Sequence, residues 1–353
     1  MSDFRNAIEK IGALLLAWFA TLLFIELHAP LPWMLGPLTS IALASMLGLP
    51  TRSWDPLRNI GQWIIGIALG LYFTPAVAHL LISAWWVIAL SITWSLILGY
   101  FFGVWLHFFN APHMTNFNRA TSYFSGPIGG ASEMTLLSER ENAVTDLVAS
   151  AHSMRLLIVT LVIPFGIQWA NFGQIQITQP VVREISLWGM GVLAHLTAIG
   201  IFVMMKLKRA NPWFMGAMLV SMIVTMMDVR LTALPSEATN VAQLFIGVSL
   251  GVRFNRQFVK SAPRWLFSVA IGTFGMIFLC ILFSYVLLEM THLPFATLIL
   301  ASAPGGITEM AITAKVLQLG APIVTVFQSS RLVAVLLLSG PLYQWLYVRK
   351  TSD

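Results

Sequence analysis

The sequence predicts an all-α membrane protein of about ten transmembrane helices in two inverted five-span repeats, each with a broken or re-entrant Gly/Pro segment. The first observation behind this fold class is composition. Of 353 residues, 58% are hydrophobic and only 10% are charged, against roughly 25% charged in a soluble domain. Residues 59–118 contain no Asp, Glu, Lys or Arg. Because about 20 apolar residues suffice to cross a bilayer as a helix, this stretch is long enough for more than one crossing.

The second observation is that the series of apolar segments occurs twice. Charged and turn residues divide the chain into spans and interrupted segments in the same order in each half. The two predicted repeats are residues 1–175 and 176–353. The first has spans at 11–28, 31–49, 59–75, 84–108 and 146–169 and a broken segment at 121–141; the second has spans at 186–205, 212–229, 240–254, 266–289 and 322–346 and a broken segment at 297–318.

The two halves also match in residue identity, which separates a true repeat from two merely apolar halves. The second span opens with Pro-Trp-x-x-Gly at Pro32 and again at Pro212. A segment Ser-x-Pro-(x)-Gly-Gly-x-x-Glu-Met begins at Ser125 and at Ser302. In both halves, 22 residues separate its glutamate from an arginine in the next span.

The distribution of basic residues tests the orientation of the repeats. Five spans per repeat is an odd number, so the second repeat must enter the membrane from the opposite side. Cytoplasmic loops collect Lys and Arg, and the predicted inside loops are far richer in them. With the N-terminus inside, those loops hold Arg5, Lys10, Arg52, Arg58, Arg119, Lys206, Lys208, Arg209, Arg253, Arg256, Lys260, Arg264, Arg349 and Lys350, whereas the outside loops hold only Arg183 and Arg230. Both termini are therefore expected in the cytoplasm.

Several functional classes find no support in the sequence. The net charge of +6 does not indicate a nucleic-acid partner, because the basic residues lie in short loops between apolar spans. Cys280 is the only cysteine, so a disulfide framework or thiolate metal site is not expected. The seven histidines form no set at metal-ligand spacing. We expect no cofactor, no catalytic residue and no enzymatic activity.

The matched broken segments are the strongest candidates for a functional site. Proline removes a backbone donor and glycine tolerates non-helical dihedral angles, so a helix should break there and restart after the glycines. Paired discontinuous segments in corresponding positions of two halves point to a transporter binding site, although such breaks can also serve helix packing alone. The candidates are Ser125, Pro127, Gly129 and Gly130 in the first segment and Ser302, Pro304, Gly305, Gly306 and Thr308 in the second.

Glu133 and Glu309 follow the glycine pairs by one helical turn. A carboxylate inside a span costs a few kcal/mol and is usually retained for ion coupling or substrate contact. The alternative is a buried ion pair with Arg155 or Arg331 in the following span. For these arginines, a structural role and the binding of an anionic solute weigh equally.

Two further sets of polar residues complete the candidates. His152 lies one turn before Arg155, where the second repeat has Gln328; it could handle protons or simply donate a hydrogen bond in a helix contact. The second-tier candidates share the third span of each repeat with glycines spaced for close helix packing. They are Asn59, Gln62, Asn240 and Gln243.

These motifs carry a resemblance that covers nearly the whole chain. The duplicated Ser-x-Pro-(x)-Gly-Gly-x-x-Glu-Met segment, the x-x-Arg-Leu helix that follows it and the Pro-Trp-x-x-Gly motif resemble the AbrB family of bacterial membrane proteins, which carries the AbrB duplication. Some members are labelled ammonia monooxygenase or regulator. The resemblance implies a multi-pass protein of the bacterial inner membrane with two homologous halves, and it supplies no substrate.

The leading hypothesis is a secondary transporter that moves a small anionic or zwitterionic solute by alternating access, coupled to Na⁺ or H⁺. Its partners would be that solute and the lipid bilayer, with a homodimer as an open alternative and no nucleic acid. A membrane regulator of gene expression that acts indirectly is the second hypothesis. A metal-dependent membrane oxygenase is the third, and it would need a metal-binding cluster.

Overall fold

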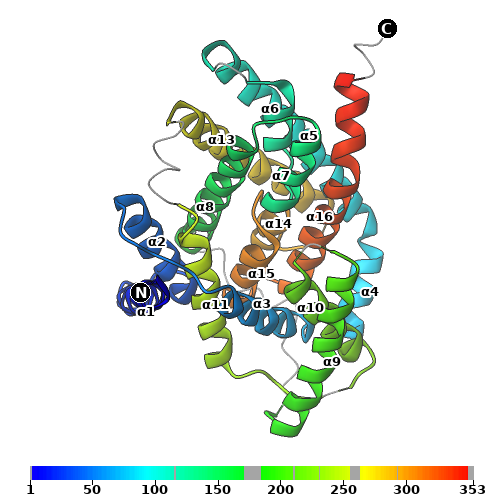
Figure 1. Ribbon diagram of the computed structural model, residues 1–353. Coiled ribbons are helices and arrows are strands. Elements are labelled where there is room, and N and C mark those ends of the chain that lie inside the picture. Colours follow the sequence, from blue (N-terminus) through cyan, green and yellow to red (C-terminus); the bar gives the residue numbers. More distant parts are fainter. Residues whose placement is uncertain are drawn as a thin grey trace. The chain divides into compact units, whose positions relative to one another are not determined.

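The computed structural model describes residues 2–114, 117–170, 184–209, 211–229, 231–254, 263–291 and 293–348. Helices and short connections make up this part of the chain, which contains no strand (Figure 1). The helices are α1 (Ser2–Glu26), α2 (Pro32–Leu47), α3 (Asp55–Gly70), α4 (Pro75–Ser83), α5 (Trp85–Asn110), α6 (Arg119–Ser125), α7 (Ala131–Arg140), α8 (Thr145–Ala170), α9 (Leu187–Lys206), α10 (Pro212–Met226), α11 (Ser236–Gly251), α13 (Pro263–Met290), α14 (Phe295–Ser302), α15 (Ile307–Val316) and α16 (Ala321–Tyr343).

The chain divides into two compact units, and each unit takes helices from both halves of the sequence. The first unit contains α1 to α4 and α9 to α11, and the second contains α5 to α7, α13, α14 and most of α8 and α16. The predicted repeat boundary at 175/176 lies outside the described residues, as do Arg183, Arg230, Arg256, Lys260, Arg349 and Lys350.

Within the described residues, six helices are long and apolar enough to cross a membrane: α1, α5, α8, α9, α13 and α16. The helices α3 and α4 would add a seventh span if this pair, bent by 83°, counts as one. The helices α2 and α10 are apolar but shorter, and a 16-residue helix is only about 24 Å long, less than the roughly 30 Å of a hydrocarbon core. The described residues thus give the helices of a membrane protein, and the count of ten spans stays a prediction.

The Pro-Trp-x-x-Gly motif begins α2 and α10 in the same way. In each case proline is the first helical residue, where its missing N–H costs no intrahelical bond. The residue before it, Leu31 or Asn211, has a positive φ of 46° or 47°. Few non-glycine residues adopt this left-handed conformation, so its recurrence shows that the two motifs fold alike.

Glycines allow the closest helix contacts in the first unit. A methyl group at Gly66 of α3 would lie 3.0 Å from Ala217 Cβ of α10, and one at Gly247 of α11 would lie 2.6 Å from the Met34 carbonyl oxygen of α2. The pairs α3–α10 and α11–α2 therefore join corresponding segments of the two predicted repeats. The glycine spacing on α3 and α11 thus serves helix packing, as the sequence indicated.

Candidate functional site

The first broken segment lies in the second unit, between α6 and α7. The Asn118 side chain caps α6 by accepting a hydrogen bond from the Thr121 backbone N–H at 2.8 Å. Helix α6 then ends at Ser125, residues 126–130 are not helical, and α7 begins at Ala131 with Gly130 as its N-cap. The sequence correctly placed this interruption at the Gly-Pro and Gly-Gly residues. Figure 1 shows the short helices α6 and α7 that result.

Arg155 of α8 binds the backbone carbonyls that this break exposes. Its guanidinium donates hydrogen bonds to the carbonyl oxygens of Ser125 and Gly126, at 3.2 and 2.9 Å, and to that of Pro127 at 2.9 Å. The side chain is only 3% exposed. The last carbonyls of a helix have no intrahelical partner and carry partial negative charge. Arg155 therefore satisfies and neutralises the C-terminal end of α6.

The second broken segment, between α14 and α15, repeats this arrangement. Helix α14 ends at Ser302 and α15 begins at Ile307. Arg331 of α16 donates hydrogen bonds to the carbonyl oxygens of Ser302 at 3.5 Å, Ala303 at 2.6 Å and Gly305 at 2.9 Å. The sequence left a structural role and a solute-binding role equally open for both arginines. In this structure both are bound to backbone carbonyls.

His152 and Gln328 occupy corresponding positions and make corresponding bonds. His152 Nδ1 lies 2.7 Å from an Arg155 nitrogen, and Nε2 lies 2.9 Å from the Phe124 carbonyl oxygen. Arginine can only donate and a carbonyl can only accept, so His152 is neutral with its proton on Nε2. Gln328 likewise accepts from Arg331 through Oε1 and donates to the Leu300 carbonyl oxygen through Nε2.

Glu133 and Glu309 lie at the opposite end of each break. Each is the third residue of its helix, the position from which a glutamate reaches back toward the N-cap. Their carboxylates lie so close to Gly130 and Gly306 that a methyl group on either glycine would collide with Oε2. A carboxylate at a helix N-terminus is stabilised by the helix dipole. Glu309 is 6% exposed, whereas Glu133 is half-buried.

The helices α8 and α16 each contact both breaks. One turn after Arg155, the Val159 side chain of α8 would lie 3.0 Å from a methyl group at Gly305 in the second break. One turn after Arg331, Val335 of α16 would lie 3.3 Å from a methyl group at Gly129 in the first. An α-helical turn rises only about 5.4 Å. The two breaks therefore converge on one region of the second unit.

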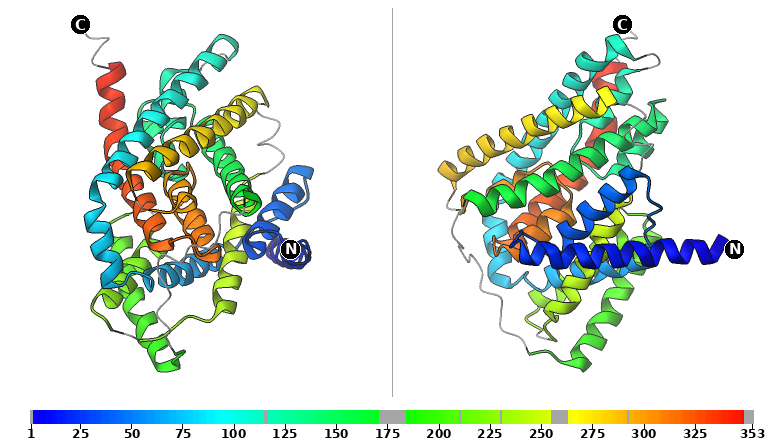
Figure 2. Two further views of the ribbon diagram at one scale, coloured as in Figure 1. Left: turned by 180° about the vertical axis from the view of Figure 1, so that it is seen from behind. Right: turned by 90° about the vertical axis from the view of Figure 1, so that its left-hand side faces the viewer.

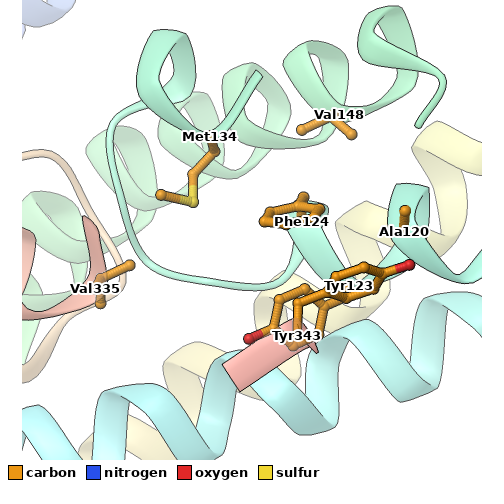
Figure 3. Close-up of a cluster of buried hydrophobic side chains, with 7 residues drawn as sticks. All are labelled: Ala120, Tyr123, Phe124, Met134, Val148, Val335 and Tyr343. Carbon is orange, nitrogen blue, oxygen red and sulfur yellow. The ribbon is translucent and has the colours of Figure 1, made fainter. Parts of the chain in front are cut away.

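An aromatic cluster closes one side of the first break. The Tyr343 ring of α16 lies 5.1 Å from the rings of both Tyr123 and Phe124 of α6, and the Tyr123 hydroxyl donates to the Ser339 carbonyl oxygen at 3.0 Å. Figure 3 shows the three rings beside one another, tilted or edge-on and not stacked. The buried members of the cluster are Ala120, Tyr123, Phe124, Met134, Val148, Val335 and Tyr343. The second segment has Leu300 and Ala301 where the first has Tyr123 and Phe124.

The other candidates fall into two groups. Ser125 donates within α6 to the Thr121 carbonyl oxygen, and the Ser302 hydroxyl lies 2.9 Å from that of Ser284 on α13. Pro127, Pro304 and Thr308 are buried in the breaks. The second-tier residues belong to the first unit, not to the unit that holds the breaks. They are Asn59, Gln62, Asn240 and Gln243.

Sequence reasoning missed the valines that link the breaks and the tyrosines that pack beside them. A signal for the valines was present, because Val159 and Val335 each follow the arginine by four residues. Within the described ranges, no group of three or more His, Cys, Asp and Glu side chains is placed to hold a metal ion.

The described residues form a helical membrane protein whose second compact unit contains two matched discontinuous helices. The chain belongs to the AbrB family, whose model, described as "Transition state regulatory protein AbrB", matches residues 33–347. The resemblance noted in the sequence motifs is thereby confirmed.

Two relatives match over most of their length. The uncharacterized protein YhjN of Bacillus subtilis (strain 168) is 28% identical over 341 residues, which cover 89% of this chain and 87% of the relative. The protein of Escherichia coli (strain K12) with the name "Putative regulator AbrB" is 24% identical over 336 residues, which cover 90% of each chain. No solved structure matches the chain.

Proposed function

We propose that the protein is a secondary transporter of a small anionic or zwitterionic solute, which binds where the two broken helices converge. The observation that carries the proposal is the matched pair of breaks, each contacted by both α8 and α16. A broken helix in a membrane is tolerated only where it is buried in protein or lines a wet cavity. Transporters use such segments to bind solutes and coupling ions.

The positions of Glu133 and Glu309 suggest how solute and proton would be coupled. Each carboxylate occupies the N-terminal end of the restarted helix, the location that attracts an anionic group. A bound solute carboxylate would compete with the glutamate for that end. Protonation of the glutamate removes its charge and weakens its hold on the helix, which frees the backbone N–H groups for the solute. Proton and anion would then travel together.

The occupied carbonyls favour H⁺ over Na⁺ as the coupling ion. At broken helices, Na⁺ is commonly coordinated by unwound backbone carbonyls. In this chain, Arg155 and Arg331 donate to those carbonyls at both breaks. A sodium ion would have to displace a buried guanidinium, whereas a proton needs only an accessible carboxylate. Glu133 is the more exposed of the two and is therefore the first candidate to exchange the proton.

Transport is tested by reconstitution. The purified chain is placed in liposomes and screened with organic acids and amino acids under a proton gradient and, separately, under a sodium gradient. We expect uptake of at least one acid, faster than in protein-free liposomes, that a proton ionophore abolishes and that persists without sodium. Uptake that requires sodium would contradict the choice of ion, and a panel without any protein-dependent uptake would contradict the function.

The membrane arrangement is part of the proposal. It has ten spans in two inverted repeats, 1–175 and 176–353, in a bacterial inner membrane with both termini in the cytoplasm. The matched contacts of the two repeats and the basic residues of the expected inside loops support it. Since Cys280 is the only cysteine, a Cys280→Ala chain can carry a reporter cysteine at Ser53 or Glu184. An impermeant maleimide should label position 184 and not 53 in intact cells, and the reverse pattern would contradict the topology.

The regulator named among the relatives is compatible with a transporter, because moving a metabolite across the membrane changes gene expression indirectly. No specific contact in the structure favours a regulatory function or bears on enzymatic activity. The transporter is therefore the function we propose.

A further inference from the structure

One side of α5 carries buried hydrogen-bond donors without a partner. The hydroxyls of Ser91 and Ser95 and the indole nitrogen of Trp94 make no hydrogen bond within the part of the chain that the structure describes. Ser91 is only 8% exposed and Ser95 only 3%. Buried polar side-chain atoms are nearly always hydrogen-bonded in native proteins, so these three neighbouring exceptions call for a common explanation.

The two serines differ from other hydroxyl residues of the apolar helices. Thr93, on the same helix, donates to the carbonyl oxygen four residues earlier at 2.9 Å, and Ser284 of α13 does the same at 2.8 Å. Serine and threonine inside a helix commonly bond their hydroxyls in this way. Ser91 and Ser95 make no such bond, so their hydroxyls remain available to donate.

The donors lie between the two breaks. The Trp94 indole lies beside the thiol of Cys280 on α13, which accepts hydrogen bonds only weakly. That thiol donates to the Ser302 carbonyl oxygen of the second break at 3.3 Å. On another side of α5, a methyl group at Gly99 would lie 2.9 Å from Pro127 Cα in the first break. Figure 2 shows α5 (cyan) and α13 (yellow) beside each other.

Helix geometry places the serines between these two contacts. Each residue advances about 100° around an α-helix, so Trp94 and Trp105, eleven residues apart, share one side of α5. That side packs on α13, because the Trp105 indole donates to a carbonyl oxygen of α13 at 3.2 Å. Gly99 lies on the side next to the first break. Ser91 and Ser95 lie in the arc between the two sides and therefore face the region where the breaks converge.

We propose that Ser91, Trp94 and Ser95 bind the carboxylate of the solute, an inference that rests on the proposed transport function. All three groups can donate, and an indole can only donate, so they suit an acceptor. A carboxylate has about four acceptor sites, so α5 can supply donors in addition to the N–H groups of a restarted helix. Ser95 also lies near the middle of the predicted span 84–108, the depth at which transporters bind solutes.

The ring of Trp94 supplies the apolar part of this site. It stacks on Phe283 of α13, with the ring centres 4.9 Å apart and the planes 8° from parallel. Small-molecule sites combine such apolar walls with a few placed polar groups. The neutral donors of α5 would hold the solute while the two glutamates of the restarted helices exchange the proton.

Alanine variants separate binding from structure. A buried hydroxyl without a partner does not stabilise the fold, so Ser91→Ala/Ser95→Ala should keep or raise the wild-type Tm in detergent. The matched control is Ser268→Ala, because the buried Ser268 hydroxyl bonds both Asn110 and the Trp265 carbonyl oxygen. This control should lower the Tm. An equal loss of Tm from the α5 serines would show that they serve the structure and would overturn the proposal.

Cysteine labelling tests whether the site takes an anion. In a Cys280→Ala chain in liposomes, Ser95→Cys is treated with 2-sulfonatoethyl methanethiosulfonate, an anion, and with its cationic trimethylammonium analogue. We expect the anionic reagent to react about tenfold faster, after each rate is divided by that with free cysteine, because hydrogen bonds to a charged group are strong. Thr93→Cys, on an exposed part of the same helix, should react with neither reagent.

The second donor provides the decisive comparison. Adding Ser91→Ala to the Ser95→Cys chain should remove most of the preference for the anionic reagent. No reaction at Ser95→Cys, or a faster reaction with the cation, would overturn the site. An anion preference at Ser95→Cys without uptake of any acid would leave the anion site and contradict transport. Uptake by Ser91→Ala/Ser95→Ala with the half-saturating concentration of wild type would leave transport and overturn the site.

Discussion

Replacement of Arg155 by glutamine should destabilise the protein severely, because Arg155 joins α8 to the end of α6. The guanidinium donates to three backbone carbonyls and to His152. A glutamine amide is shorter and can replace at most one or two of these bonds. One or two of the three carbonyls are then left without a donor, at about 1–3 kcal/mol each, so the free energy of unfolding should fall by about 1–6 kcal/mol.

Two matched variants separate the shape of the guanidinium from its charge. Arg155→Lys keeps the positive charge but replaces a planar fork by a point charge, so its loss should be smaller than that of Arg155→Gln. Arg331→Gln should match Arg155→Gln, because Arg331 makes the same set of bonds at the second break. Arg209 is exposed, and Arg209→Gln should change stability by no more than about 0.5 kcal/mol.

The assay is thermal unfolding in detergent, and the quantity measured is the fraction of protein that remains monodisperse after heating. Membrane proteins often unfold irreversibly, so all variants are compared at one heating rate. We expect Arg155→Gln to lower the apparent Tm by several degrees and Arg155→Lys by an intermediate amount. An unchanged Tm for Arg155→Gln would refute the conclusion that this arginine satisfies the broken helix.

Three further outcomes follow from the packing and hydrogen bonds. The free energy of unfolding of His152→Gln should stay within about 1 kcal/mol of wild type, because Gln328 makes the equivalent bonds in the second segment. His152→Leu should lower it by about 1–3 kcal/mol, and equal losses of stability for the two variants in a urea titration would contradict the shared role. Gly200→Ala should destabilise by about 1–3 kcal/mol, because its methyl group would lie 2.7 Å from a carbonyl oxygen of α10, whereas a methyl group at Gly191 on the same helix meets open space, so Gly191→Ala should be neutral or stabilising. The Tm of Gly200→Ala should therefore be lower than that of Gly191→Ala, and the reverse order would contradict the packing. Tyr123→Phe removes the bond to the Ser339 carbonyl and should cost about 1 kcal/mol, so a Tm equal to that of wild type would argue against that bond.

The sequence was a good guide to the helical breaks because glycine and proline act locally. Gly-Gly and Ser-x-Pro determine where a helix stops and restarts whatever surrounds them, and both breaks occur at the expected residues. The glycine spacing of α3 and α11 likewise indicated close packing, although it could not say that α10 and α2 would be the partners.

The partners of the buried charges could not be predicted in the same way. From the sequence, Glu133 and Arg155 were separated by a fixed number of residues and could be imagined as an ion pair. In the structure, the arginine binds the C-terminal carbonyls of one helix and the glutamate lies at the N-terminus of the next. Every residue carries the same backbone carbonyl, so a pattern of residue types does not indicate which carbonyls need a donor. Hydrogen bonds from side chains to the backbone therefore cannot be predicted by comparing side chains.

In the proposed function, Glu133 and Glu309, at the N-terminal ends of the two restarted helices, couple proton and solute movement. The most direct measurement compares uptake of the transported acid by wild type, Glu133→Gln and Glu309→Gln in identical liposomes, with and without an imposed proton gradient. A glutamine cannot release a proton, so both variants should lose the acceleration that the gradient gives wild type while remaining folded. Gradient-driven uptake at the wild-type rate in both variants would contradict the claim.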